Sequence, residues 1–407
     1  MNYLLFSFLP PTQKVSSGIM LDQLCRMVPR EDISCFVAKD PLFKVGISPD
    51  LSWIPHRIIN EPRGYSSAIG KLLPGTPGQC AGFIAELARN FFIDKTVIDQ
   101  AVRFGKNYRV DCVWAVLQGK TTIISARKIA MKLGVPLIVM VLDDPSWVLD
   151  AVGLDKYSKK KVLAEFDKAI KHSIACGTAS RAMADDYSKR YGVKTIVFWG
   201  SLDKKMAREP ALSPNGNSQL SIGLAGQLYA TDEWNAFLAA LSSANWRISG
   251  RDVKVYLIGD LDYVDVPCGA RIEKLGRMSL DETIKTLSGM DIVYCPYFFG
   301  ENREVVAKTS FPSKLTAYFA AGRPVLFHGP KYASPAKFIE ENNAGICCYS
   351  LESGQILEKL ALLADDNELY AKLTKNGTKA FLKYLTLDNL KSALTSFLGA
   401  PFTHESN

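Results

Sequence analysis

Short apolar segments alternate with helical patterns along the whole chain. The segment at residues 137–142, Leu-Ile-Val-Met-Val-Leu, contains no polar residue. An uninterrupted apolar run of this length is typical of a strand that is buried on both faces. Between such segments, apolar residues recur at the three- and four-residue spacing of amphipathic helices. The alternation predicts an α/β fold in which crossover helices join the strands of parallel sheets.

The rhythm is interrupted once, between residues 203 and 219, where Pro210, Pro214 and Gly216 lie in a stretch without periodicity. We interpret this stretch as a linker, because 407 residues exceed the size of one ordinary hydrophobic core. We expect Rossmann-like domains over residues 1–202 and 220–382. Residues 383–407 are expected to form a terminal helix and tail that pack back on the N-terminal domain.

The segment at residues 310–325 has the features of an anion site. Pro312 is suited to the first turn of a helix, and Ser313 is available as a cap or a phosphate contact. The free N–H groups of a first helical turn attract anions, and Lys314 adds a full positive charge beside them. Gly322 is expected to end this helix. In doubly wound sheets ligands bind at the carboxyl ends of the strands, so a diphosphate would fit here.

The same segment, Pro-Ser-Lys-Leu followed by Tyr318 and by Ala-Ala-Gly-Arg-Pro-Val, resembles the donor-binding helix of GT-B glycosyltransferases related to glycosyltransferase family four. Residues 222–228 resemble the Gly-rich turn that opens the second domain of these enzymes. Residues 275–278, with the helix and strand up to Pro296, resemble their base-binding loop. Residues 175–192 are similar to the end of their first domain. The order of these segments is more specific than any one of them.

The resemblance implies the GT-B fold, in which two doubly wound Rossmann-like domains face each other across a cleft. It also implies a hexosyltransferase-like activity, with the nucleotide-sugar donor on the second domain and the acceptor on the first. The implied donor-binding residues are Gly18 from the first domain and Gly226, Gln227, Arg277, Met278, Ser313, Lys314 and Tyr318 from the second. Tyr297 follows a predicted strand, where it either lines the donor pocket or packs in the core.

Three positions depart from the family pattern. A Glu is usual just before the helix tyrosine, where this chain has Ala317, and a second Glu is usual eight positions upstream, at Thr309. The Arg of the Gly-rich turn is replaced by Gln227. We hypothesise that Arg303 and Lys308, in the loop before the helix, supply the missing positive charge.

Candidate chemistry in the first domain lies after the apolar run. Asp143 and Asp144 follow it directly, so one carboxylate would serve as a general base whose pKa the other raises. Equally, Asp144 precedes Pro145 and would cap the next turn. Trp147 is either a platform for a sugar ring or a core residue. His56 is a candidate acceptor contact, although a lone histidine is more often structural.

Composition narrows the classes of protein. The net charge of +8 favours an anionic small molecule, an anionic lipid surface or nucleic acid, and no nucleic-acid motif supports the last. The run Lys159-Lys160-Lys161 is either a solvated helix face or a peripheral membrane contact. The nine cysteines form no Cys-x-x-Cys pair and the four histidines show no metal spacing. We expect no metal, no cofactor besides the donor substrate, and a reducing cytoplasmic location, either free or at the inner face of a membrane.

The chain contains neither a P-loop nor a Gly-x-Gly-x-x-Gly turn after its first strand, which argues against nucleotide triphosphatases and typical dehydrogenases. The leading hypothesis is sugar transfer from a nucleotide-diphosphate sugar to a hydroxyl of a glycan, polysaccharide or lipid-linked saccharide. Lys314 would stabilise the leaving diphosphate without a metal, and the family implies retention. The alternatives are a nucleotide-sugar epimerase or hydrolase, or a non-catalytic GT-B partner protein. Ala317 and Gln227 favour the last, whereas Lys314 favours an enzyme.

Overall fold

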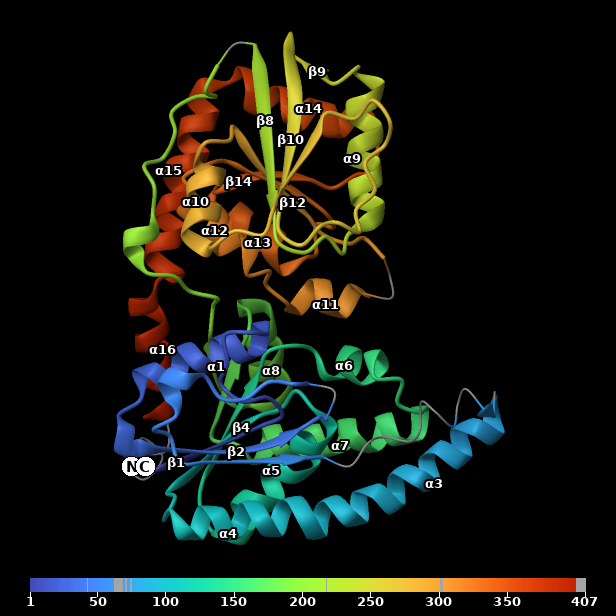
Figure 1. Ribbon diagram of the computed structural model, residues 1–407, viewed down its shortest axis with the longest axis vertical. Coiled ribbons are helices and arrows are strands. Elements are labelled where there is room, and N and C mark those ends of the chain that lie inside the picture. Colours follow the sequence, from blue (N-terminus) through green and yellow to red (C-terminus); the bar gives the residue numbers. More distant parts are fainter. Residues whose placement is uncertain are drawn as a thin grey trace. The chain divides into compact units, whose positions relative to one another are not determined.

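The computed structural model describes residues 1–41, 43–61, 69, 72–73, 75–216, 218–300 and 303–399. The chain forms two compact units (Figure 1). The first consists of Met1–Phe198 together with the C-terminal segment from Lys391, and the second is Trp199–Leu390. Among the described residues, no helix is both long enough and apolar enough to span a membrane.

The first unit is a doubly wound sheet of seven parallel strands in the order β3-β2-β1-β4-β5-β6-β7. Its strands are β1 (Tyr3–Ser7), β2 (Ile33–Lys39), β3 (His56–Asn60), β4 (Cys112–Val116), β5 (Leu137–Val141), β6 (Ala175–Thr178) and β7 (Lys194–Val197). Its helices are α1 (Ser16–Met27), α3 (Thr76–Ile93), α4 (Asp99–Asn107), α5 (Lys120–Leu133), α6 (Pro145–Ala151), α7 (Lys156–His172) and α8 (Arg181–Tyr191). A π-helical turn, η3 (Asp94–Ile98), joins α3 to α4.

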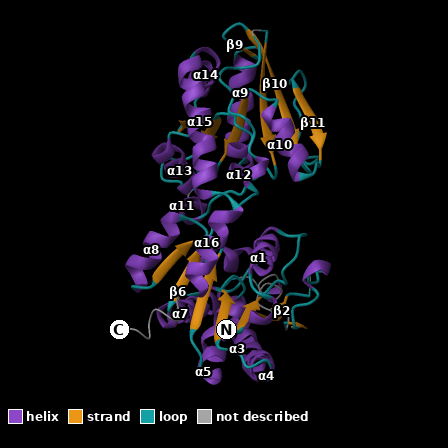
Figure 2. Cartoon of the chain, turned by 90° about the vertical axis from the view of Figure 1, so that its left-hand side faces the viewer, coloured by secondary structure: helices purple, strands orange, loops and turns teal. Residues whose placement is uncertain are grey.

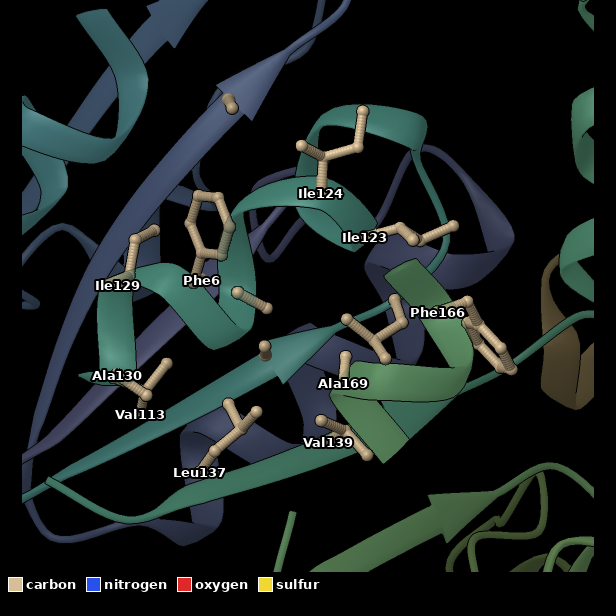
Figure 3. Packing of buried hydrophobic residues seen from close by; sticks show 14 of the residues in the cluster. Phe6, Val113, Ile123, Ile124, Ile129, Ala130, Leu137, Val139, Phe166 and Ala169 are labelled. Atoms are coloured by element: carbon tan, nitrogen blue, oxygen red, sulfur yellow. The ribbon is translucent and has the colours of Figure 1, made fainter. Parts of the chain in front are cut away.

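The core of this unit follows from the two-residue period of its strands. Alternate residues of β1, β4 and β5, such as Phe6, Val113 and Val139, pack against Ile123 of α5 and Phe166 of α7 (Figure 3). The residues between them point to the opposite face, where the ring of Trp114 contacts that of Phe397 at 6.0 Å. Because both faces are covered, the strands carry the uninterrupted apolar runs that the sequence shows.

The second unit has the same winding, with the order β11-β10-β8-β12-β13-β14, and the short strand β9 pairs with β10 antiparallel to it. Its strands are β8 (Gln219–Ala225), β9 (Arg247–Ile248), β10 (Arg251–Ile258), β11 (Ile272–Gly276), β12 (Ile292–Pro296), β13 (Val325–His328) and β14 (Gly345–Cys348). Its helices are α9 (Thr231–Ser243), α10 (Leu280–Ser288), α11 (Glu304–Thr309), α12 (Lys314–Ala320), α13 (Ser334–Asn342), α14 (Ser353–Asp365) and α15 (Asn367–Tyr384). Figure 2 shows helices on both faces of this sheet. The two parallel α/β sheets confirm the predicted fold class.

The stretch predicted as a linker, residues 203–219, is attached to the second unit by hydrogen bonds. The N–H of Arg208 donates to the carbonyl of Ala320 at 2.7 Å, and Thr374 donates to the carbonyl of Ala211 at 2.6 Å. Gly322 has a φ of +64°, and a Cβ there would lie 2.7 Å from the carbonyl oxygen of Glu209. Gly322 therefore ends α12, as predicted, and also lets this stretch pass close to it.

The C-terminal helix α16 (Leu387–Leu398) begins in the second unit and ends in the first. Within the first unit, the carbonyl of Leu398 accepts a hydrogen bond from the hydroxyl of Tyr3 at 2.7 Å, and Phe397 packs on Phe198. The part of the predicted tail beyond residue 399 lies outside the described residues.

One buried hydrogen-bond chain fixes the end of β13 in the second unit. Nε2 of His328 lies 2.8 Å from the carbonyl oxygen of Ser350, so this nitrogen carries the proton and donates. Nδ1 therefore accepts from the hydroxyl of Tyr294, 2.7 Å away. Burial lowers the pKa of His328 from its ordinary value of 6.5 to about 4.

We expect this histidine to make stability depend on pH. Above pH 6.5 it is neutral in both the folded and the unfolded chain, whereas below that pH the unfolded chain takes up a proton more readily. The free energy of unfolding should therefore fall by up to about 3 kcal/mol between pH 6.5 and pH 4 through this group alone. Denaturant unfolding of wild type and His328→Gln at several pH values checks this: the variant should lack that part of the slope, and equal slopes would contradict it.

Candidate functional site

The strand order of the second unit reverses between β8 and β12, and ligands of doubly wound sheets bind where this happens. The turn after β8 and the loop after β12 lie on the two sides of this point. Helix α12 reaches the same place through Tyr318, whose hydroxyl accepts from the N–H of Ala225 at 2.9 Å. The end of β8 is thus held by α12.

Two glycines, which have no Cβ, leave the polar backbone groups accessible at this edge. Gly226 follows β8 with a φ of +82°, and Gly259 follows β10 with a φ of +130°. A Cβ on Gly259 would lie 3.5 Å from the nitrogen of Gly226, so the two turns pack backbone against backbone. Gly226 and Gln227 are exposed. Polar backbone groups without side chains are what allow a phosphate to approach closely.

Lys314 lies against this turn. Its Nζ donates to the carbonyl oxygen of Gln227 at 2.7 Å and lies 5.2 Å from the centre of the Tyr229 ring. Burial lowers the pKa of Lys314, because the ammonium group has lost part of its hydration. An ammonium group has three N–H donors, and among the described residues Lys314 donates to one hydrogen-bond acceptor, the carbonyl oxygen of Gln227. An anion beside Gly226 would complete its coordination.

Arg303 binds the same loop from another side. Its Nη1 donates to the carbonyl oxygen of Tyr229 at 3.2 Å, and its guanidinium lies 5.3 Å from the ring centre of Phe298. Lys314 and Arg303 therefore hold carbonyl groups two residues apart in one loop. The positive charge of Arg303 also acts on Glu233. The pKa of Glu233 is raised overall, because burial raises it more than the N–H of Phe299 and the charge of Arg303 lower it.

Lys308, the second predicted substitute for the missing charge, is placed differently. It forms an ion pair with Glu304, and its ammonium lies 5.4 Å from the ring centre of Tyr332. Because the Glu304 carboxylate is its immediate partner, Lys308 does not share the Gln227–Tyr229 loop contacts of Arg303 and Lys314.

The other predicted donor residues divide into exposed and buried groups. Arg277 is 80% exposed and pairs with Asp260 at 3.6 Å, directly after β11. Ser313 is exposed at the start of α12 and makes no capping bond with its side chain. Met278 packs partly against the core. Tyr297 and Tyr318 are buried. The ring of Tyr297 is stacked on that of Phe298, with 4.6 Å between the ring centres, and Tyr318 binds the backbone of Ala225, so neither side chain is exposed at the turn.

In the first unit, the acidic pair lies at the carboxyl end of β5. Asp143 accepts a hydrogen bond from Nε2 of Gln118, which follows the neighbouring strand β4. Burial raises the pKa of Asp143, the charge of Asp144 raises it further, and the Gln118 bond lowers it. Asp144 caps α6 by accepting from the N–H groups of Ser146 and Trp147 at 2.9 and 3.2 Å. Of the two carboxylates, Asp143 is therefore the one that is not engaged in capping α6.

Gln118 is a residue that the sequence patterns did not reveal. Its Oε1 is buried and has no hydrogen-bond partner among the described residues, although its amide nitrogen is bonded to Asp143. Buried carbonyl oxygens without a donor are rare and costly. A ligand hydroxyl that donates to this oxygen would satisfy it. The signal for it was its place: two residues after a strand that ends at the switch point between β1 and β4.

The remaining predicted residues of the first unit are spread over it. Trp147 is 41% exposed on α6, one helical turn from Asp144. His56 begins the edge strand β3, and its Nδ1 lies 2.8 Å from the carbonyl oxygen of Ile54. This is the amino end of the sheet, opposite the edge that carries Asp143, so the structure does not bring His56 and Trp147 together. Gly18 is buried in α1, where a Cβ would lie 2.4 Å from Cγ2 of Thr12.

Comparisons with known proteins give the fold a context. The sequence matches no protein-family profile and no curated protein sequence. HepE of Anabaena, solved in complex with UDP, is 13% identical, with a TM-score of 0.66 over 98% of this chain and 100% of its own. Sucrose-phosphate synthase of Thermosynechococcus elongatus is 10% identical, with a TM-score of 0.65 over 99% of this chain and 100% of its own.

The α,α-trehalose 6-phosphate synthase of Burkholderia multivorans is 12% identical, with a TM-score of 0.63 over 100% of both chains. These matches extend over the full length and show that the chain has the GT-B fold, as predicted. A specific relation to glycosyltransferase family four stays a prediction.

We expect charge reversal at Arg303 to weaken the binding of a nucleoside diphosphate by about ten-fold, because a carboxylate would replace the cation bonded to the carbonyl of Tyr229. Lys308→Glu is the matched control, since Lys308 already pairs with Glu304. Calorimetric titration of Arg303→Glu, Lys308→Glu and wild type measures the difference. Equal affinities for wild type and Arg303→Glu would show that Arg303 only fixes the loop.

Proposed function

We propose that this protein is a glycosyltransferase that binds a nucleotide-diphosphate sugar on its second unit and transfers the sugar to a hydroxyl acceptor. The observation that carries the proposal is the Lys314 ammonium, held against the glycine turn after β8 with its pKa lowered. Structural relatives support it, since HepE was solved with UDP and also with UDP and glucose.

The chemistry of leaving-group departure explains why such a lysine is useful. When the bond between sugar and diphosphate breaks, negative charge builds up on the departing phosphate oxygens. A cation that is already partly dehydrated and fixed stabilises this charge more than a mobile, hydrated one. Lys314, bonded to the carbonyl of Gln227, is such a cation. Arg303, which is exposed and bonded to the carbonyl of Tyr229, adds a second positive charge at the same loop.

Acceptor activation is proposed for the first unit. Asp143 has a raised pKa, so it is a stronger base than an ordinary aspartate and can take the proton of an attacking hydroxyl. The amide oxygen of Gln118 would accept a hydrogen bond from another hydroxyl of the same acceptor. Retention of configuration, metal independence and a location at the inner face of a membrane stay predictions.

The donor site is tested with nucleotides. Thermal unfolding in the presence of UDP, GDP, ADP or CDP should show stabilisation by at least one of them, of about 2.7 kcal/mol at a concentration 100-fold above Kd. Lys314→Ala should lose most of this stabilisation, whereas Lys308→Ala should keep it. If no nucleotide stabilises the wild type, the non-catalytic partner becomes the better description.

The affinity for that nucleotide should also depend on pH. Bound diphosphate favours the charged form of Lys314, whose pKa in the free protein is lowered. Affinity should therefore be highest while Lys314 is protonated and should fall as the pH rises through its lowered pKa. Titrations at increasing pH check this: Lys314→Arg should bind with little pH dependence, because arginine stays protonated. A wild-type profile as flat as that of the arginine variant would contradict it.

The two aspartates make a matched pair for the acceptor side. Asp143→Asn should lower turnover of the identified nucleotide-sugar by about 100-fold or more, which is the usual contribution of a general base. Asp144→Asn should change it little, because asparagine caps helices as well as aspartate does. Release of nucleoside diphosphate over time measures both. Similar losses in the two variants would indicate that the pair only shapes the loop.

A further inference from the structure

Helix α3 of the first unit buries its charged side chains and exposes a row of apolar ones. The charged side chains on it, Glu86 and Arg89, are both buried. Glu86 pairs with Lys120 at 3.0 Å, and Arg89 donates to the hydroxyl of Thr121 at 3.2 Å and lies 3.6 Å from Glu61. The inward face of this helix is therefore committed to a buried ionic network beside the start of α5.

The outward face of α3 is apolar. Ile84, Leu87, Phe91 and Phe92 are 66, 38, 66 and 60% exposed, and Cys80 is exposed as well. The spacing 80, 84, 87 and 91 places Cys80, Ile84, Leu87 and Phe91 on one stripe of the helix. A helix of a soluble protein normally turns such a stripe toward its core. Here nothing among the described residues covers it.

Cations lie at both ends of this stripe. Toward its C-terminal end, α3 continues through η3 into α4 (Figure 1), where Lys95, Arg103 and Lys106 are exposed. The nearby carboxylate of Asp99 is already paired with Lys132 at 2.8 Å. At the N-terminal end, Lys156 is exposed, and its backbone N–H donates to Gln79 of α3. The described part of α3 itself exposes no charged side chain.

We propose that α3 binds the interfacial region of an anionic lipid bilayer, with the stripe of Cys80, Ile84, Leu87 and Phe91 inserted among the acyl chains. Lys95, Arg103 and Lys156 then meet the lipid phosphates. An apolar stripe bordered by cations is the pattern of helices that lie in the plane of a membrane surface. This inference goes beyond the transfer reaction and does not depend on it.

The charges favour a membrane over a second copy of the chain. In a symmetric dimer through α3, antiparallel helices would place the cations at one end against the cations at the other. Parallel helices would place each cationic end against its own equivalent. Both arrangements bring like charges together, whereas anionic headgroups complement them at both ends.

Co-sedimentation of the full chain with vesicles tests the proposal. One set of vesicles is phosphatidylcholine alone, which carries no net charge. The other contains about 30 mol% of the anionic lipid phosphatidylglycerol, which gives the surface a negative potential. The wild type should sediment with the anionic vesicles. Ile84→Ser combined with Phe91→Ser should reduce the bound fraction at least ten-fold. Lys95→Gln combined with Arg103→Gln should weaken binding by about five-fold for each cation removed.

The matched control combines Met131→Ser and Leu212→Ser, two exposed apolar residues outside α3. It should bind as the wild type does. Unchanged thermal unfolding of each variant shows that the loss is not misfolding. The proposal is overturned if the wild type ignores anionic vesicles, if the control loses as much binding as the α3 variant, or if the wild type is a dimer that Ile84→Ser and Phe91→Ser dissociate. Nucleotide binding, measured separately, keeps this outcome apart from that of the proposed function.

Discussion

The candidate site of the second unit depends on one contact, the hydrogen bond from the Lys314 ammonium to the Gln227 carbonyl. Bringing a cation out of water lowers the stability of the fold, and the lowered pKa of Lys314 is the sign of this cost. A cation that was partly dehydrated during folding needs little further dehydration when an anion arrives. Burial of this ammonium therefore lowers the stability of the free protein and, in the proposed donor site, would increase its affinity for a diphosphate.

One face of α12 sets the geometry of this contact. Lys314 and Tyr318 are four residues apart, so they lie one above the other on the same side of the helix. Tyr318 binds the backbone of Ala225 and Lys314 binds that of Gln227, two residues later in the chain. Any shift of α12 would move both bonds together. The turn between them is consequently fixed by side chains that a ligand does not have to order.

The sequence was most informative where its residues are most buried. Runs such as Leu137–Val141 and helices such as Lys156–His172 show their period because one environment surrounds a whole strand or a whole helix face. The edge strand His56–Asn60 is half-exposed and was missed, and so was α3, whose apolar stripe faces outward. The glycine turn and Lys314 could be predicted from local patterns. The contacts of Tyr229 and Gln118 could not, because each joins segments that are distant along the chain.

Helix α3, like the Lys314 site, buries charged side chains away from water. Buried ion pairs such as Glu86–Lys120 rarely add stability over apolar residues of similar size, so the core alone does not account for them. Lys120 stands two residues after Gln118, whose amide binds Asp143, so the network lies beside the acidic edge of the first sheet. On α3 the charged residues face that network, and the apolar stripe is exposed. The exposed stripe of α3 thus accompanies the burial of its charges, and surroundings less polar than water would lower the free energy of that arrangement.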